Sequence, residues 1–118
     1  MLNKVILSGR LGKLTNKKLF GNPDGDNCCC YFDVAFSKYS KHKEDTITDW
    51  IHCKVWGNQA KRFIKHSDDG LFIEVEGYLK NEKNEEIERT YVIVTSFQFY
   101  KTAPRIILNE DAIDQEER

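Results

Sequence analysis

Alternate residues between positions 50 and 56 place two indoles, an imidazole and an ammonium group in one row. The row is Trp50, His52, Lys54 and Trp56, and the residues between are Ile51, Cys53 and Val55. Successive side chains of a β-strand point to opposite faces, so the apolar set predicts a core side and the other set an outer side. Indoles on an outer face offer stacking surfaces for nucleic-acid bases of any identity, and a lysine between them is placed to meet phosphates. The structural alternative is that one indole caps a barrel and the other packs on a helix.

Basic residues elsewhere fit the same chemistry. A first strand over residues 4–11 carries Lys4 and Arg10 on the face opposite its apolar side chains. A polar segment over residues 38–46 contains a tyrosine among three lysines, which predicts a basic loop with a stacking ring: Tyr39, Lys38, Lys41 and Lys43. For both groups the alternative is ordinary solvated charge.

Composition and charge narrow the class of protein. The length of 118 residues suits one domain, and a hydrophobic share of 40% excludes wholesale disorder. Residues 1–108 hold 17 bases and 14 acids, a net charge of +3, whereas residues 109–118 carry a net charge of −4. A basic body favours a polyanionic partner. No apolar run approaches the roughly 18 residues of a membrane span, and the N-terminal apolar stretch is too short for a signal peptide, which predicts a cytoplasmic protein.

Metal binding and catalysis find little support. Cys28, Cys29 and Cys30 are consecutive and Cys53 stands alone, so the C-x-x-C spacing of a tetrahedral metal site is missing. The three histidines fall on different elements, and no nucleophile, zinc-protease or phosphate-loop motif is present. We therefore expect no enzyme, no metal and no cofactor.

The elements that position these residues follow from hydrophobic periodicity. Alternation with period two predicts strands over residues 4–11, 28–37, 48–56, 71–79 and 89–100, with loops over 16–27 and 38–46 and a hairpin tip over 81–88. Ala60, Phe63 and Ile64 share one face of a helix over residues 58–66, with Asn58 as its N-cap. Five strands with one short helix between the third and fourth are typical of the OB-fold, an all-β barrel.

The remaining apolar residues bear on assembly and on the domain boundary. Phe72 and Tyr78 lie off the apolar stripe of the fourth strand. They either extend the stacking face or belong to a subunit interface or the core, and we favour interface or core. The fifth strand has surplus apolar residues, namely Tyr91, Ile93, Phe97, Phe99 and Tyr100. Together with a free edge on the first strand, they predict a homo-oligomer. Pro104 ends regular pairing, so we expect a domain over residues 1–102 and a short acidic tail over residues 103–118.

Five stretches in this order resemble the bacterial single-stranded DNA-binding proteins. They are NKVILSGRLG (3–12), FDVA (32–35), TDW (48–50), VWGNQA (55–60) and IEVEGYL (73–79). The resemblance implies an OB-fold subunit, usually of a homotetramer, that coats single strands in DNA replication, recombination and repair. It assigns stacking to Trp50 and Trp56, with Tyr39 or Ser40 near a third position.

The chain also departs from that family. Lys83 and Asn84 stand near a further aromatic position of the family, and neither has a ring. The long Gly/Pro/Gln-rich linker and the apolar acidic tip are missing from this sequence. We therefore expect little recruitment of repair and replication enzymes through the tail, as in a plasmid, phage or other mobile-element variant or a specialised paralogue.

Three functions remain open at this point. The first is a sequence-independent coat of single-stranded DNA. The second is a primosome-like OB-fold accessory dimer that bridges a helicase or other replication enzyme. The third is an OB-fold RNA binder, because stacking and phosphate contacts do not exclude ribose.

Overall fold

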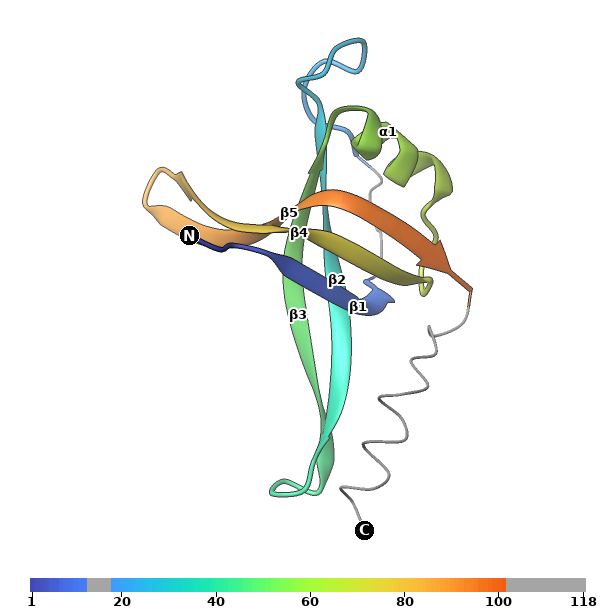
Figure 1. Cartoon of the computed structure of the whole chain (residues 1–118), viewed down its shortest axis with the longest axis vertical. Coiled ribbons are helices and arrows are strands. Elements are labelled where there is room, and N and C mark those ends of the chain that lie inside the picture. Colours follow the sequence, from blue (N-terminus) through green and yellow to red (C-terminus); the bar gives the residue numbers. More distant parts are fainter. Residues whose placement is uncertain (13–17, 102–118) are drawn as a thin grey trace.

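A closed five-stranded barrel with one helix forms the body of the protein (Figure 1). The computed structural model describes residues 1–12 and 18–101. Its elements are β1 (Val5–Leu11), β2 (Cys29–Ser40), β3 (Asp45–Trp56), α1 (Gly57–His66), β4 (Phe72–Asn84) and β5 (Ile87–Tyr100). The strand order β1-β2-β3-β5-β4, with α1 between β3 and β4, confirms the expected OB-fold. The expected acidic tail, residues 103–118, lies outside the described residues.

The core is built from the inner faces of the strands and one face of α1. Phe63 of α1 stacks on Phe32 with ring centroids 4.2 Å apart, and it also meets the rings of Phe97 and Phe99. Ile93 and Phe97 are buried, so these two residues belong to the core and not to surplus surface on β5. The α1 residues that face the core are those predicted from helical spacing, because Ala60 and Phe63 are buried.

The helix begins directly after β3, one residue earlier than predicted. Trp56 is the N-cap, without a side-chain cap hydrogen bond, and Gly57 is the first helical residue, so the expected capping by Asn58 is wrong. Gly57 has a φ of +65°, a left-handed conformation that glycine adopts without a Cβ penalty. Its N–H donates to the Cys28 carbonyl at 2.7 Å. The glycine therefore lets the chain pass from strand to helix without a loop.

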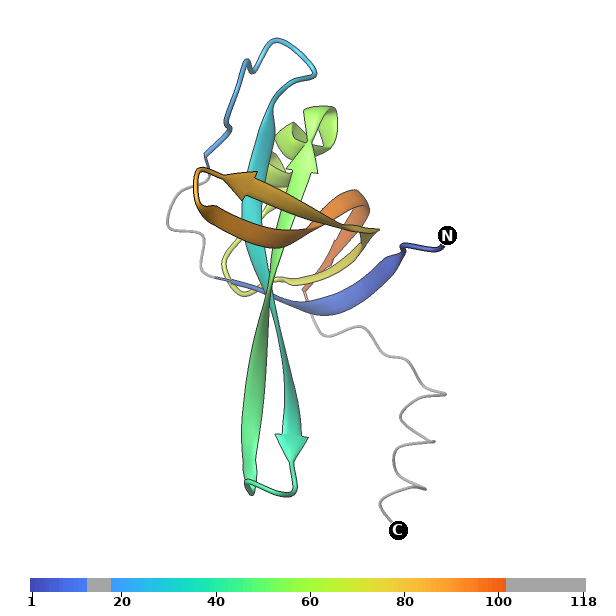
Figure 2. The ribbon, with the colours of Figure 1, turned by 90° about the vertical axis from the view of Figure 1, so that its left-hand side faces the viewer.

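The hairpin of β2 and β3 is longer than expected. Residues 38–46 are not a loop, because the strands pair as far as Ser40 and Asp45 and only residues 41–44 form the turn. The hydroxyls of Ser37 and Thr48 are 2.8 Å apart across this ribbon. Polar residues at these strand ends form backbone hydrogen bonds across the hairpin but bury no apolar side chains. The apolar alternation that predicts strands is therefore missing there. The two strands leave the barrel together as a projecting arm (Figures 1 and 2).

The hairpin of β4 and β5 also extends beyond its expected ends. The predicted tip over residues 81–88 is mostly strand, and pairing continues to Asn84 and Ile87. The register sets Glu82 opposite Arg89 and Lys83 opposite Glu88. Opposite charges that face each other across two strands favour pairing. In the sequence alone, the same run of charged residues is typical of a solvated hairpin tip. A second arm therefore projects from the barrel (Figure 1).

One side of β1 is free for part of its length. Residues 5–10 of β1 pair with β4, whereas only Arg10 and Leu11 pair with β2. Val5 to Ser8 thus have no strand partner on the β2 side within the described residues. Ile6, in this stretch, is 67% exposed. In the same described part of the chain, no helix is long and apolar enough to cross a membrane.

We predict that Gly77→Ala destabilises the fold. A bulge between Glu76 and Gly77 interrupts the β4–β5 register, and a Cβ at Gly77 would overlap the carbonyl of Ile93. Overpacking of this kind costs about 1–3 kcal/mol, which urea unfolding would measure. Gly25→Ala is the control, because the atom nearest its added Cβ is 3.8 Å away. Equal unfolding midpoints for the two variants would contradict the prediction.

Candidate nucleic-acid interface

The outer face of β3 carries the row of side chains that the sequence indicated. Trp50 and Trp56 are 55% and 43% exposed, while Cys53 and Val55 on the other face are buried. Side chains two residues apart on a strand are about 6.6 Å apart, so the two indoles stand roughly 20 Å from one another along β3. The register places β2 residues beside the row, with Ala35 opposite Trp50. Alternation alone was enough to predict this face.

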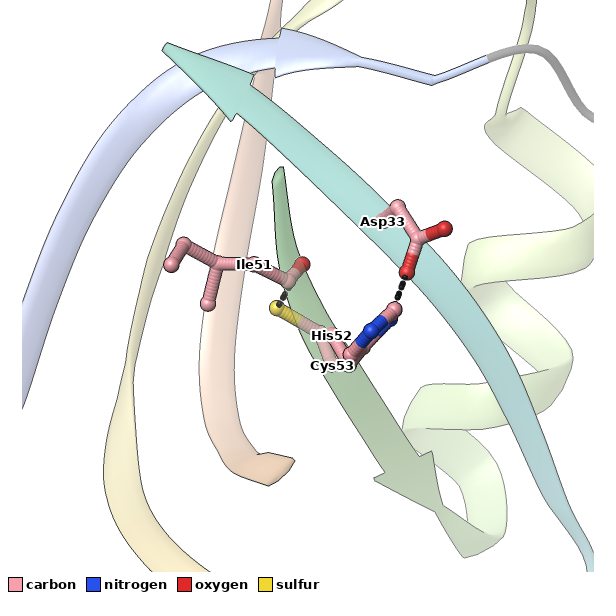
Figure 3. A network of polar contacts seen from close by, with 4 residues as sticks. All are labelled: Asp33, Ile51, His52 and Cys53. Carbon is pink, nitrogen blue, oxygen red and sulfur yellow. Dashed lines mark hydrogen bonds and ion pairs between the residues drawn. The ribbon is translucent and has the colours of Figure 1, made fainter. Parts of the chain in front are cut away.

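His52, in the middle of the row, is engaged by an acid. Its Nδ1 lies 2.6 Å from Oδ1 of Asp33 on β2 (Figure 3). A carboxylate only accepts hydrogen bonds, so Nδ1–H donates and the ring orientation is fixed. Both side chains are partly exposed. The pair brings a carboxylate into the row, which makes this part of the face a poor place for a phosphate.

Lys54 is also paired, and it is nearly buried. Its ammonium donates to both carboxylate oxygens of Glu82, at 2.9 and 3.0 Å, and only 5% of the residue is exposed. The Nζ atom lies 4.4 Å from the ring centre of Trp56 and 5.2 Å from that of Tyr31. Burial disfavours the charged form, but the hydrogen bonds with Glu82 and Tyr31 outweigh it and raise the pKa of Lys54. In this arrangement its ammonium is committed to Glu82, and phosphate contact by Lys54 stays a prediction.

Three further rings join this end of the row. Tyr31 of β2 lies 5.5 Å from the rings of both Phe20 and Tyr91, and Tyr91 lies 6.2 Å from the His52 ring. Sequence reasoning did not assign Phe20 or Tyr31 to the face and gave Tyr91 to an interface. Alternation on β2 puts Tyr31 on the side of Asp33, which was the available signal. Phe20 lies in a loop segment, where no periodicity identifies it.

A groove lies at the opposite end of the row, beside Trp50. It has a volume of about 570 Å³ and is lined by Trp50, Arg10 and Phe72, with parts of β1, β2 and β3. The guanidinium carbon of Arg10 is 5.0 Å from the centre of the Phe72 ring. Arg10 has no carboxylate partner within the described residues, so a cation and three rings, those of Trp50, Phe72 and Phe36, line one open groove. Phe72 is thus half-buried at the groove, neither core nor free surface.

On the β2–β3 arm, the tyrosine ring and the three lysines lie in different places. Tyr39 is 63% exposed and pairs with Thr46, and alternation puts it on the same ribbon face as Trp50. Lys38 points to the other face, and Lys41 and Lys43 lie in the turn at the tip. None of these three lysines has an ion-pair partner among the residues that the structure describes.

Lys4 is placed apart from the other predicted cations. It precedes β1 and forms an exposed ion pair with Glu76 of β4, at 2.8 Å. The hydrogen bond from Lys4 holds the pKa of Glu76 below its usual value. The structure therefore brings Trp50, Arg10 and Phe72 together at one end and Trp56, Lys54 and Tyr31 at the other, but leaves Lys4 outside both groups.

The cysteines are not arranged for chemistry. All four are free and buried. Burial raises the pKa of Cys30 and of Cys53 to about 12, so these thiols stay protonated at neutral pH. Among the described residues, no group of three or more His, Cys, Asp or Glu side chains is placed to hold a metal ion.

Comparison with known proteins gives one family match over most of the chain. Residues 2–100 match the model of the Single-strand binding protein family. The single-stranded DNA-binding protein of Staphylococcus epidermidis is 27% identical over 94 residues, which cover 79% of this chain and 69% of that protein. Single-stranded DNA-binding protein A of Bacillus subtilis is 28% identical over 98 residues, covering 83% of this chain and 56% of that protein. The chain thus spans from just over half to about two-thirds of these relatives.

A solved structure shares the fold. The chain of a Plasmodium falciparum SSB complex with ssDNA superposes with a TM-score of 0.67 and 22% sequence identity. The match covers 85% of this chain and 96% of that chain. Nearly the whole of that chain therefore has a counterpart in the barrel described above.

Proposed function

The chain belongs to the Single-strand binding protein family, and we propose on that basis that it binds and protects single-stranded DNA without sequence preference. The family consists of DNA-binding proteins and not of enzymes. The observation that carries the proposal is the exposed pair of indoles, Trp50 and Trp56, on one face of β3. Every base has a π-face, so stacking on these rings is independent of sequence.

Phosphate contacts in this proposal come from the unpaired cations. Arg10 lines the groove beside Trp50, and Lys38, Lys41 and Lys43 lie on the projecting arm. Lys54 and His52 are not counted among these cations, because Glu82 already engages the Lys54 ammonium and Asp33 engages Nδ1 of His52. The strand would thus stack along β3 while its backbone meets the groove rim and the arm.

We further propose that the protein forms a homo-oligomer and acts in the cytoplasm in DNA replication, recombination or repair. One OB-fold covers roughly 4–16 nucleotides, and joining several sites on one strand raises avidity without new contacts. The free side of β1, with Ile6 exposed, is a surface on which a second copy can add a strand. A tetramer is favoured, with a dimer as the alternative. The four free thiols support the proposed cytoplasmic location, because the cytoplasm keeps cysteines reduced.

The first prediction of this proposal concerns the indoles. Trp50→Ala and Trp56→Ala should each weaken oligo(dT) binding by about 1–3 kcal/mol, because each removes one stacking surface. Tryptophan fluorescence should fall on binding in the parent protein. Trp50→Phe, which retains a ring, is the control. Fluorescence that does not change at saturating oligo(dT) would overturn the stacking face, and tighter binding of poly(U) than of poly(dT) would favour an RNA binder.

Salt dependence tests the phosphate contacts separately. Replacing Lys38, Lys41 and Lys43 by glutamine should make the log–log salt slope shallower by roughly 0.7 for each phosphate that the arm no longer neutralises. Lys65→Gln is the control, because Lys65 is an exposed residue of α1, at the other end of the molecule from the arm (Figure 1). If the triple variant and the parent have the same salt slope, the lysines of the arm do not contact phosphates.

Assembly is tested by a charge at the free side of β1. We expect light scattering to give a homo-oligomer at micromolar concentration for the parent, and a smaller species for Ile6→Glu, because a buried unpaired carboxylate opposes the interface. Ile87→Glu is the matched control, since Ile87 is similarly exposed, at 64%, but lies on the β4–β5 arm. A monomeric parent protein would contradict the proposed assembly.

A further inference from the structure

Lys54 connects three strands through one ammonium group. The residue is on β3, its carboxylate partner Glu82 is on β4, and the rings beside it are Tyr31 of β2 and Trp56 of β3. The ammonium is the buried member of the group, whereas the two rings are 41% and 43% exposed. Each ring therefore keeps a solvent-exposed part beside the buried ammonium.

The ion pair also joins two strands that are not neighbours in the barrel. β5 lies between β3 and β4 in the strand order, so no backbone ladder links them. Glu82 belongs to the part of β4 that forms the projecting arm with β5, where it faces Arg89. Its two hydrogen bonds to Lys54 thus tie the outer part of this arm, close to its turn at residues 85 and 86, to the aromatic face. Glu82, Tyr31 and Tyr91 line a common pocket of about 360 Å³ at this place.

We propose that Lys54 and Glu82 form a positioning pair that holds the rings of Tyr31 and Trp56 as stacking surfaces. This inference rests on the proposed function, that is, on single-stranded DNA binding at this face. Lys54 neutralises no phosphate in this role, because its charge is already paired with the carboxylate of Glu82. Glu82 carries a negative charge and yet promotes the binding of a polyanion, because it fixes the lysine on which the rings rest.

The sign of the Glu82 effect separates this role from simple charge repulsion. If the carboxylate acted only through its charge, its removal would tighten DNA binding, most at low salt where screening is weakest. A positioning role gives the opposite result, because a buried lysine without its carboxylate withdraws from the rings toward water.

The experiment compares Glu82→Gln, Lys54→Met and the double variant in oligo(dT) titrations over a range of salt. Each single variant should bind on the order of tenfold more weakly than the parent, near the lower limit for the loss of one stacked base. The double variant should lose no more than either single variant, since the two act as one unit. The salt slope should stay that of the parent in Lys54→Met. Emission from Trp56 in the free protein should shift in both single variants.

Glu88→Gln is the matched control, because Glu88 is an exposed acid of the same arm, opposite Lys83. It should leave affinity unchanged or slightly increased. Lys54→Met leaves Glu82 at the protein surface, so this variant keeps the test available even if Glu82→Gln does not fold. Tighter binding by Glu82→Gln, or a slope shallower by roughly 0.7 in Lys54→Met, would overturn the proposal.

The two levels of failure can be told apart. If the parent does not bind oligo(dT), the proposed function itself is wrong. If the parent binds and Trp50→Ala weakens binding while Glu82→Gln and Lys54→Met bind like the parent, only the positioning pair is refuted.

Discussion

One face of β3 packs in the barrel core and the other lies outside the barrel, because successive side chains of a strand point to opposite sides. The inner face of β3 must fill the barrel, so Cys53 and Val55 are buried among the aromatic rings and branched side chains of the core. The outer face then receives every second residue, and these include the two indoles. A shift of pairing by one residue would exchange the faces and lose the core. The free energy of burying the inner face thus fixes the register of the outer one.

The outer face is nearly neutral, although it belongs to a protein with a basic body. Asp33 engages His52 and Glu82 engages Lys54, while Arg10 keeps an open position over the Phe72 ring. A row of unpaired cations between the indoles would have to be desolvated whenever bases covered it, at a high cost in free energy. Pairing Lys54 with Glu82 lowers this cost. Under the proposed function, attraction of a polyanion then falls to Arg10 at the groove rim and to the lysines of the β2–β3 arm.

Structural features that depend on residues close together in the sequence could be predicted, whereas contacts between residues far apart in the sequence could not. The β3 face and the apolar side of α1 follow from spacing within about ten residues, and both were correctly predicted. The strand ends of the two arms were not, because Asp45, Thr46 and the charged residues near Glu82 pair in solvent without an apolar alternation. The contact of Lys54 with Glu82 joins positions 28 residues apart on non-neighbouring strands. No local pattern specifies such a contact, and neither does any pattern bring Phe20 beside Tyr31.

The arms differ from the barrel in what stabilises them. Near the tip of the β2–β3 arm most side chains are exposed on both faces, so backbone pairing and contacts such as Ser37 with Thr48 hold it without a core. Segments with few buried contacts open locally at a low cost in free energy. Under the proposed function, the barrel would give a fixed surface for bases, while the β2–β3 arm would follow a phosphate backbone of variable course. Near the tip of the β4–β5 arm, by contrast, an ion pair between the buried Lys54 and the partly buried Glu82 joins the arm to the barrel. In this proposal, stacking and contact with the nucleic-acid backbone thereby fall to parts of different rigidity.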